Sequence, residues 1–440
     1  MASSIPLAVF RGTRTAPATP PTGRFTRYHG RQFPQRFVPI DMTGFRRPAV
    51  GFVLACVFLD ALGIGLIIPV LPRLIGTLAE TRELQTVWYG AIMLSYGLMQ
   101  FAAAPVIGAL SDRIGRRPVL LAGIGGLALM MVVPVFATSL WAILASRLVG
   151  GAVSSNIVVA QAYIADVTRA GDRTAAFGRI GAVFGIAFVL GPALGGVLGE
   201  ADPRLPFMVA SALCLVNFLY GLFVLPESLT APDTRPISPA ALNPFRTLRS
   251  LSAERHLLPA LAIIVLFTLT QSLVQCTWAL YTEFRYGWSP KSIGLSIFAL
   301  GAVITLTQGL VLPRVSRKFT PDTVVRGGLA VGLLAIVGIG LTGSGTVAGL
   351  LLCGFALMGV VGPTLQSVVS RTGSPSEQGA RLGAVSALNS FTGAVSPMIG
   401  TPLLLAAPGE GLPYLLFSLL LVAALGAAIR HRLPGGHSAH

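Results

Sequence analysis

The chain has 440 residues, of which 53% are hydrophobic and 11% are charged, and its mean hydropathy is +0.75. This composition excludes a water-soluble globular protein, which could not bury so much apolar surface, and predicts an all-α integral membrane protein in a lipid bilayer. The formal net charge of +16 does not indicate a nucleic-acid partner, because the basic residues follow the expected membrane topology instead of gathering in one water-facing domain.

Residues 1–41 are rich in arginine and proline and contain no acid before Asp41. They hold no apolar run long enough for a signal peptide, so we expect a disordered N-terminal tail. Met42 lies just before the first apolar run and is an alternative start of the chain. A transit peptide is a third interpretation.

Twelve apolar runs follow, each close to the roughly 20 residues that a helix needs to cross a bilayer. They lie at 49–70, 87–107, 118–136, 140–163, 175–199, 205–225, 257–281, 292–312, 323–342, 346–368, 382–406 and 411–430. The polar, proline-bearing stretch 226–256 divides them equally. This predicts a six-helix bundle over 42–225, a cytoplasmic connection over 226–256, a second six-helix bundle over 257–431 and a tail over 432–440.

The two predicted bundles show a weak internal repeat. Arg179-Ile-Gly-Ala-Val recurs as Arg381-Leu-Gly-Ala-Val, and Gly191 falls on Gly393 at the same offset. Placing both termini in the cytoplasm puts most arginines on that side, as the positive-inside rule requires. The basic residues left on the other side are Arg73, Arg82, Arg204, Arg285 and Lys291.

Asp60 lies near the middle of the first apolar run, within Leu59-Asp-Ala-Leu-Gly-Ile-Gly-Leu-Ile-Ile-Pro-Val-Leu-Pro72. An ionised carboxylate at that depth costs roughly 2.5 to 3.5 kcal/mol on insertion scales, so an acid there marks an ion or substrate pathway. We expect Asp60 to bind and release a proton. The alternative is an acid that only fixes helix packing through hydrogen bonds.

The connection between the second and third runs reads Gly108-Ala-Leu-Ser-Asp-Arg-Ile-Gly-Arg-Arg-Pro-Val119. It resembles the signature loop of the major facilitator superfamily, which implies two repeated bundles with a substrate site between them. The resemblance identifies a gating loop made of Gly108, Asp112, Arg113, Gly115, Arg116 and Arg117. It also implies that Asp112 and Arg116 bond to neighbouring helices in the outward-facing state, and Asp166 is the expected partner of Arg116.

Arg147 lies in the fourth run, beside Gly150 and Gly151, and is the one basic residue that we expect deep in a helix. By the same resemblance it is the arginine associated with proton coupling in antiporters. The alternative is an arginine whose guanidinium reaches back to a membrane interface.

The fifth run contains glycines that permit close helix approach and a proline that kinks the helix. Its pattern is similar to the antiporter signature of drug exporters, although Ala187 replaces one expected glycine. The matching residues are Gly178, Gly191, Pro192, Gly195 and Gly196. This resemblance favours export over uptake, and plain helix packing is the alternative.

Amides are the other polar side chains within the runs, and Gln271 and Gln275 share one helix face by their spacing. The amides that we expect to line a substrate cavity are Gln100, Asn156, Gln271, Gln275 and Gln308. Simple hydrogen bonding between helices is the alternative. No metal site is predicted, because the four cysteines show no paired spacing and no histidine lies at membrane depth.

Three stretches together resemble the tetracycline-efflux branch of the superfamily: Leu59 to Pro72, Gly108 to Val119, and Trp278-Ala-Leu-Tyr-Thr-Glu-Phe-Arg-Tyr-Gly-Trp288. Members of that branch exchange a tetracycline and magnesium complex for protons across the bacterial inner membrane. The resemblance therefore implies a proton-driven exporter without a cofactor, with Mg²⁺ carried on the substrate, and we expect it to act as a monomer.

The substrate stays open between tetracycline, another lipophilic drug and an endogenous metabolite. Enterobacterial pumps carry acidic and histidine residues at three positions that here hold Met130, Ile304 and Gly332. The sequence contains no Gly-x-Ser-x-Gly, no His-Glu-x-x-His and no Gly-Lys-Ser/Thr phosphate loop, so we predict a transporter and not an enzyme.

Overall fold

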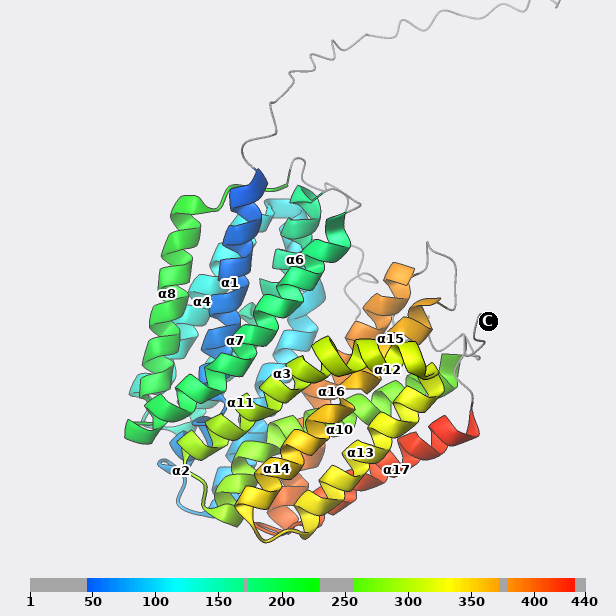
Figure 1. Cartoon of the computed structure of the whole chain (residues 1–440). Coiled ribbons are helices and arrows are strands. Elements are labelled where there is room, and N and C mark those ends of the chain that lie inside the picture. The colour runs from blue at the N-terminus through cyan, green and yellow to red at the C-terminus, as the bar shows by residue number, and fades with distance from the viewer. Residues whose placement is uncertain (1–45, 155, 169–171, 230–256, 372–377, 432–440) are drawn as a thin grey trace, which may run out of the picture. The chain divides into compact units, whose positions relative to one another are not determined.

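The computed structural model describes residues 46–154, 156–168, 172–229, 257–371 and 378–431, and these fold into helices with no strand among them (Figure 1). The predicted tails and most of the predicted 226–256 connection lie outside the described residues. The helices before that connection are α1 (Arg46–Ile67), α2 (Leu71–Gly76), α3 (Arg82–Ile114), α4 (Arg116–Phe136), α5 (Leu140–Val153), α6 (Asn156–Val167), α7 (Arg173–Ala201) and α8 (Leu205–Val224). Those after it are α10 (Leu258–Tyr286), α11 (Pro290–Leu306), α12 (Leu312–Lys318), α13 (Pro321–Leu341), α14 (Gly345–Ala356), α15 (Val361–Arg371), α16 (Gln378–Ala406) and α17 (Leu412–Arg430).

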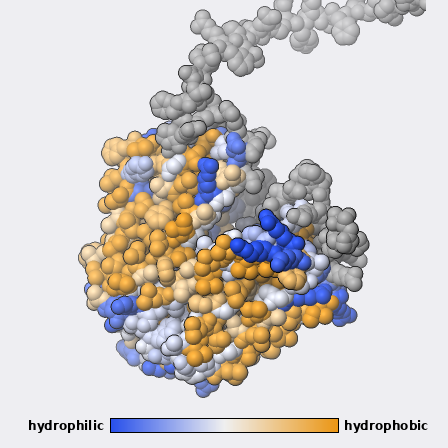
Figure 2. Space-filling model, viewed as in Figure 1, coloured by the Kyte–Doolittle hydropathy of each residue, from blue (hydrophilic) through white to orange (hydrophobic). Residues whose placement is uncertain are grey.

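Eleven helical segments in the described part of the chain are long and apolar enough to cross a membrane. The twelfth long segment, α16, has 29 residues but mixes serine, threonine and asparagine with its apolar side chains. Large apolar side chains lie on the outside of the bundle, among them Phe136, Phe223 and Leu334 at 75%, 81% and 72% exposure. Figure 2 shows such apolar atoms over the flank that faces the viewer. The predicted all-α membrane fold is therefore confirmed.

The predicted loop between the second and third apolar runs differs in the structure. The signature loop is mostly helical, because α3 continues to Ile114 and α4 begins at Arg116. Gly115 makes the turn between them with a φ of +106°, a conformation that is costly for residues with a Cβ. The fourth apolar run is covered by α5, which ends at Val153, and α6, which begins at Asn156, and residue 155 between them lies outside the described residues.

The order of helix packing repeats in the two halves. In the first half, α1 packs against α7 and α8, α4 packs against α5 and α8, and α3 packs against α5. In the second half, α10 packs against α16 and α17, α13 packs against α14 and α17, and α11 packs against α14. Helices α7 and α16 thus occupy corresponding places, in line with the echo between Arg179 and Arg381.

The halves meet through two helix pairs, α7 with α11 and α3 with α16. Glycines let the backbones approach closely, since a Cβ on Gly196 would meet Pro290 and Gly294 of α11. Three hydrogen bonds join the halves nearby. The donors and acceptors are Tyr89 Oη to the Cys276 carbonyl (2.8 Å), Gln85 Nε2 to Glu283 Oε1 (3.4 Å) and the Lys291 backbone N–H to Glu200 Oε2 (3.3 Å).

These contacts define two ends of the bundle. The end that carries Glu283, called the Glu283 end below, is where the halves close on each other. The other end carries Asp112 and Asp166 and is called the Asp112 end. In the part of α7 nearer the Asp112 end, a Cβ on Gly181 or Gly185 would meet no atom within 4 Å beyond its own stretch of helix. The halves are therefore packed together at the Glu283 end and apart along this part of α7.

Candidate functional site

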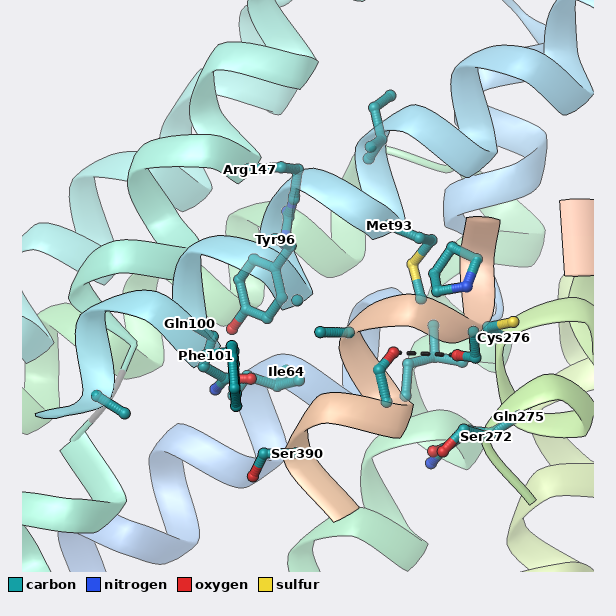
Figure 3. A pocket seen from close by; sticks show the side chains of 18 of the residues that line it. Ile64, Met93, Tyr96, Gln100, Phe101, Arg147, Ser272, Gln275, Cys276 and Ser390 are labelled. Atoms are coloured by element: carbon teal, nitrogen blue, oxygen red, sulfur yellow. Dashed lines mark hydrogen bonds between the residues drawn. The ribbon is translucent and has the colours of Figure 1, made fainter. Parts of the chain in front are cut away.

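A central cavity of about 640 Å³ lies between the halves. Helices α1, α3, α5, α6 and α7 of the first half and α10 and α16 of the second half form its wall. Most lining side chains are apolar, such as Ile64, Met93, Phe101 and Phe188. Figure 3 shows Tyr96 and Gln100 on one side of this cavity and Ser272 and Gln275 on the other. Its volume and apolar wall suit a drug-sized ligand.

A second pocket of about 430 Å³ lies within the second half and shares Ser272 and Gln275 with the central cavity. Its wall gathers five amides from four helical segments, namely Gln271, Gln275, Gln308, Gln366 and Asn389. The structure thus brings Gln271, Gln275 and Gln308 together in this pocket, whereas Gln100 lines the central cavity and Asn156 does not line either of the two. The Oδ1 atom of Asn389 is buried and has no hydrogen-bond partner among the described residues.

Asp60 does not line the central cavity. It borders a separate pocket of about 250 Å³ in the first half, which shares Ile64, Tyr96 and Gln100 with that cavity. Two amides hold its carboxylate, because Asn156 Nδ2 donates to Oδ2 at 2.8 Å and Asn217 Nδ2 donates to Oδ1 at 3.3 Å. Asn156 is therefore a partner of Asp60 and not a residue of the central cavity.

Arg147 is buried in α5 at 7% exposure and lines the central cavity. Its Nη2 lies 3.6 Å from the sulfur of Met131, and its guanidinium carbon lies 5.3 Å from the ring centre of Phe207 and 5.9 Å from that of Tyr96. Such ring contacts stabilise a cation without neutralising its charge. No carboxylate of the described residues forms an ion pair with Arg147, and its Nε atom has no hydrogen-bond partner.

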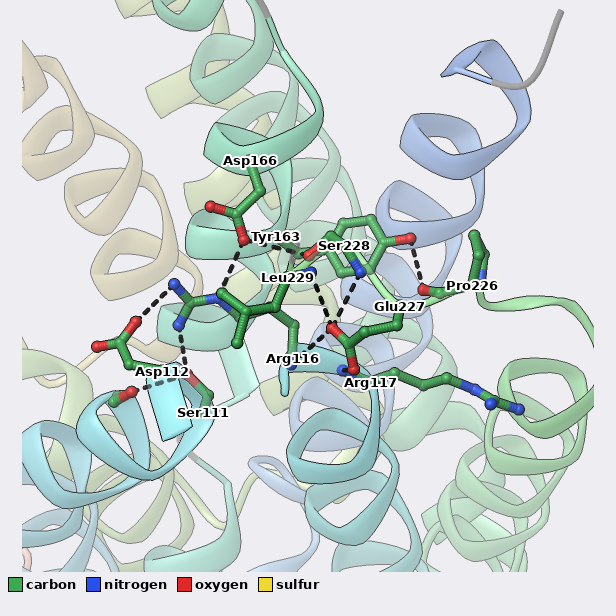
Figure 4. Close-up of polar contacts among 11 residues, drawn as sticks. Ser111, Asp112, Arg116, Arg117, Tyr163, Asp166, Pro226, Glu227, Ser228 and Leu229 are labelled. Atoms are coloured by element: carbon green, nitrogen blue, oxygen red, sulfur yellow. Dashed lines mark hydrogen bonds and ion pairs between the residues drawn. The ribbon is translucent and has the colours of Figure 1, made fainter. Parts of the chain in front are cut away.

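The gating-loop residues form a polar cluster at the Asp112 end (Figure 4). Arg116 pairs with Asp112 at 2.6 Å and with Asp166 at 3.1 Å, and its Nη1 donates to Ser111 Oγ at 2.6 Å. These bonds connect the end of α3, the start of α4 and the end of α6. The pairing of Arg116 with Asp166 expected from the sequence is present, and it lies entirely within the first half.

Glu227 belongs to the same cluster but was not predicted from the sequence. Its carboxylate accepts the backbone N–H groups of Arg116 at 2.9 Å and Arg117 at 3.1 Å, which caps the start of α4. A Cβ on Gly115 would meet this carboxylate, so the glycine permits its close approach in addition to the turn. The sequence does show an acid just after the sixth apolar run. The start of the third apolar run, expected at the same end of the bundle, has backbone N–H groups that need an acceptor.

The other gating-loop residues, Gly108 and Arg113, lie in the last two turns of α3, where the Arg113 side chain is exposed. The fifth-run glycines divide into two groups along α7. A Cβ on Gly191 or Gly195 would meet the backbone of α1. Pro192 and Gly196 lie against Gly294 of α11, while Gly178 meets open space.

Sequence reasoning missed two further partners in the first half. Asn217 of α8 holds Asp60, and Tyr96 of α3 lines both the central cavity and the Asp60 pocket. The Tyr96 hydroxyl is buried and has no hydrogen-bond partner among the described residues. Of the three positions where the sequence departs from the enterobacterial pumps, Ile304 lines the amide pocket, while a Cβ on Gly332 would meet Met358.

Comparisons with known proteins agree on one class. The family model described as "Major Facilitator Superfamily" matches residues 53–401. The class C tetracycline resistance protein of Escherichia coli is 34% identical over 86% of this chain and 96% of its own length. The solved structure of the human organic anion transporter MFSD10 (TETRAN) is 26% identical, covers 87% of this chain and 99% of its own, and gives a TM-score of 0.65.

A second solved structure shows the likeness of fold alone. The bacterial homolog of the human lysosomal transporter Spinster is 16% identical, covers 88% of this chain and 97% of its own, and gives a TM-score of 0.72. The two solved structures are of transporters, and the class C protein matches this chain over 380 residues.

Proposed function

The chain belongs to the major facilitator superfamily, and from this premise we propose that it exports a drug-like small molecule in exchange for protons by alternating access. Tetracycline is the first substrate to test, because several relatives are named as tetracycline resistance proteins. Export of another lipophilic drug rests on the same fold, since the fold does not determine the substrate.

One observation carries the proposal. Asp60 places a carboxylate near the middle of a membrane-crossing helix, in a pocket that adjoins the central cavity. Two amides orient it, and no basic side chain of the described residues neutralises it. A carboxylate without a fixed counter-ion is suited to take up and release a proton. We assign the coupling to Asp60 together with Arg147.

We place the Asp112 end in the cytoplasm of a bacterial inner membrane, with both termini on that side, because the basic residues concentrate there. The Glu283 end then faces outward, and its packed helices block exit of substrate in that direction. The ion pairs of Arg116 with Asp112 and Asp166 tie three helices of the first half together while the halves are apart near this end, and not only in the outward-facing state expected from the sequence. We therefore assign to this gating loop the task of holding the cytoplasmic end of the first half as one body when the gate closes.

The proposal is tested with tetracycline-triggered proton release in everted membrane vesicles. The Asp60→Asn protein should give no release, whereas Asp202→Asn, an exposed acid at the end of α7, should behave as the unmodified chain. Equal amounts of protein in the membrane are required for the comparison. A full response from the Asp60→Asn protein would refute the assigned role of Asp60.

Magnesium enters the proposal as cargo carried with tetracycline, and no cofactor is assigned to the protein itself. The dependence of proton release on Mg²⁺ is measured by repeating the vesicle assay with and without Mg²⁺ at a fixed concentration of free tetracycline. Loss of the response without Mg²⁺ is the result expected of a transported complex.

An endogenous metabolite is the second candidate substrate, and the amide pocket favours it. Five amides offer paired hydrogen-bond donors and acceptors to a polar ligand, while Ile304 supplies an apolar wall where the enterobacterial pumps carry a charged or histidine side chain. Drug export and metabolite export are distinguished by measuring the susceptibility of an expressing strain to several classes of drug. Resistance to no drug would leave the metabolite as the substrate.

A further inference from the structure

Arg147 is the one ionisable side chain with a permanent charge among the described residues that line the central cavity. Asp60 borders the adjoining pocket and is not among the residues that line the central cavity, and both of its carboxylate oxygens accept hydrogen bonds from Asn156 and Asn217. The cavity therefore presents a positive charge to its contents and no negative one.

Among the residues that the structure describes, no carboxylate pairs with this positive charge. The contacts of the guanidinium are a thioether and two aromatic rings, and its Nε atom is buried without a hydrogen bond. A buried cation without a counter-ion is costly in a low-dielectric region, and an anion that reached it would relieve that cost. Figure 3 shows Arg147 beside the ring of Tyr96 at the cavity wall, where a ligand in the cavity can approach it.

We propose that the central cavity selects amphiphilic organic anions, and that Arg147 binds the anionic group of the substrate while the apolar wall holds its rings or chains. This inference deepens the proposed function by naming the substrate class of the same cavity. A carboxylate, sulfonate or enolate can accept two N–H bonds from one guanidinium.

The test compares two probes of nearly equal shape, 2-naphthylacetate and the neutral 2-naphthylacetamide. Equilibrium dialysis measures their binding to the full chain in lipid nanodiscs, and empty nanodiscs correct for partition into lipid. The unmodified protein should bind the carboxylate at least about tenfold more tightly than the amide, because only the carboxylate forms a charge-assisted hydrogen bond with the guanidinium.

Arg147→Gln should bring the ratio of the two affinities to about one while the affinity for the amide stays within about twofold. Arg147→Lys keeps the charge and should keep part of the preference. The matched control is Arg73→Gln, because Arg73 is an exposed arginine that does not line the cavity. The ratio of the affinities for the two probes is compared between variants, because a difference in the amount of folded protein affects both probes equally.

Equal binding of the two probes by the unmodified protein would overturn the inference, and so would a preference that persists in Arg147→Gln. The result is independent of proton coupling, because binding at equilibrium requires no gradient. If Asp60→Asn abolishes proton release and retains the anion preference, both proposals stand. If proton release is absent in the unmodified protein and the preference is present, only the proposed exchange fails.

Discussion

Asp60 is held by side chains from two helices that lie far from it in the sequence. Asn156 begins α6 and Asn217 lies in α8, where it is fully buried and also donates to the carbonyl of Cys56 at 3.2 Å. These bonds fix the direction of the carboxylate toward the pocket that it shares with Tyr96 and Gln100. Substitutions of the two amides should therefore alter proton exchange without removing the acid.

Asn156→Ala removes the 2.8 Å bond to Asp60. Because a hydrogen bond to a charged group is worth roughly 1.5–3 kcal/mol, we expect tetracycline-triggered proton release to fall about tenfold. The measurement is the everted-vesicle assay. Gln161→Ala is the matched control, an exposed amide on the same helix. A response equal to that of the control would show that Asn156 does not support Asp60.

Glu227→Ala leaves the N–H groups of Arg116 and Arg117 at the start of α4 without their acceptor. Loss of such a cap costs about 1 kcal/mol, so the midpoint of thermal unfolding of the purified protein should fall. Glu80→Ala, an exposed acid between α2 and α3, should leave the midpoint unchanged. Equal midpoints for the two variants would contradict the capping role.

At the scale of elements, α7 is the helix whose two parts differ most. Its second part packs on α1 and α11, where Gly195 lies against the backbone of Leu66 and Gly196 lies against Pro290. In its first part, a Cβ on Gly178, Gly181 or Gly185 would meet no atom within 4 Å, while Ile180 on another face is buried. The glycines of α7 therefore lie in a packed helix interface in its second part and on an open face in its first part.

Gly195→Ala and Gly181→Ala make the same chemical change in these two environments. The first should destabilise the protein by about 1–3 kcal/mol, because its Cβ collides with backbone that cannot move aside cheaply. The second should be neutral or slightly stabilising, since alanine is the better helix former. Thermal unfolding of both purified variants gives the comparison, and an equal loss for both would contradict the packing described for α7.

At the scale of the whole molecule, the halves are joined at the Glu283 end by Tyr89, Gln85 and Lys291. Alternating access requires that this end opens and that the Asp112 end closes. The first part of α7 then approaches the second half. The small residues of this part of α7, which leave open space in the structure described here, should therefore be required for close packing in the state that is closed at the Asp112 end.

Gly181→Leu tests this requirement. A leucine fits the open face of α7 here, so the variant should fold and bind the naphthyl probes. It should nevertheless lose most export, because the larger side chain obstructs closure at the Asp112 end. Gly426→Leu is the control, an exposed glycine of α17 that also meets open space. Full export by Gly181→Leu in the vesicle assay would count against closure along this helix.

Hydropathy and length are sufficient to predict the membrane fold, because they decide whether a helix can cross a bilayer and both are local properties of the chain. The sequence also singled out Asp60, Arg147 and the Arg116 loop, since a charge inside an apolar run is visible without a structure. The pairing of Arg116 with Asp166 followed from their expected place at the same end of the bundle.

The tertiary structure alone decided which of these groups share a cavity. Asp60 and Arg147 both stand out in the sequence, yet one lies behind the wall and the other lines the central cavity. The amides Asn156 and Asn217 belong to Asp60, whereas Gln271, Gln275 and Gln308 gather in the second half. Rotation and tilt of each helix set these neighbours, and they depend on packing against helices that are distant in the sequence.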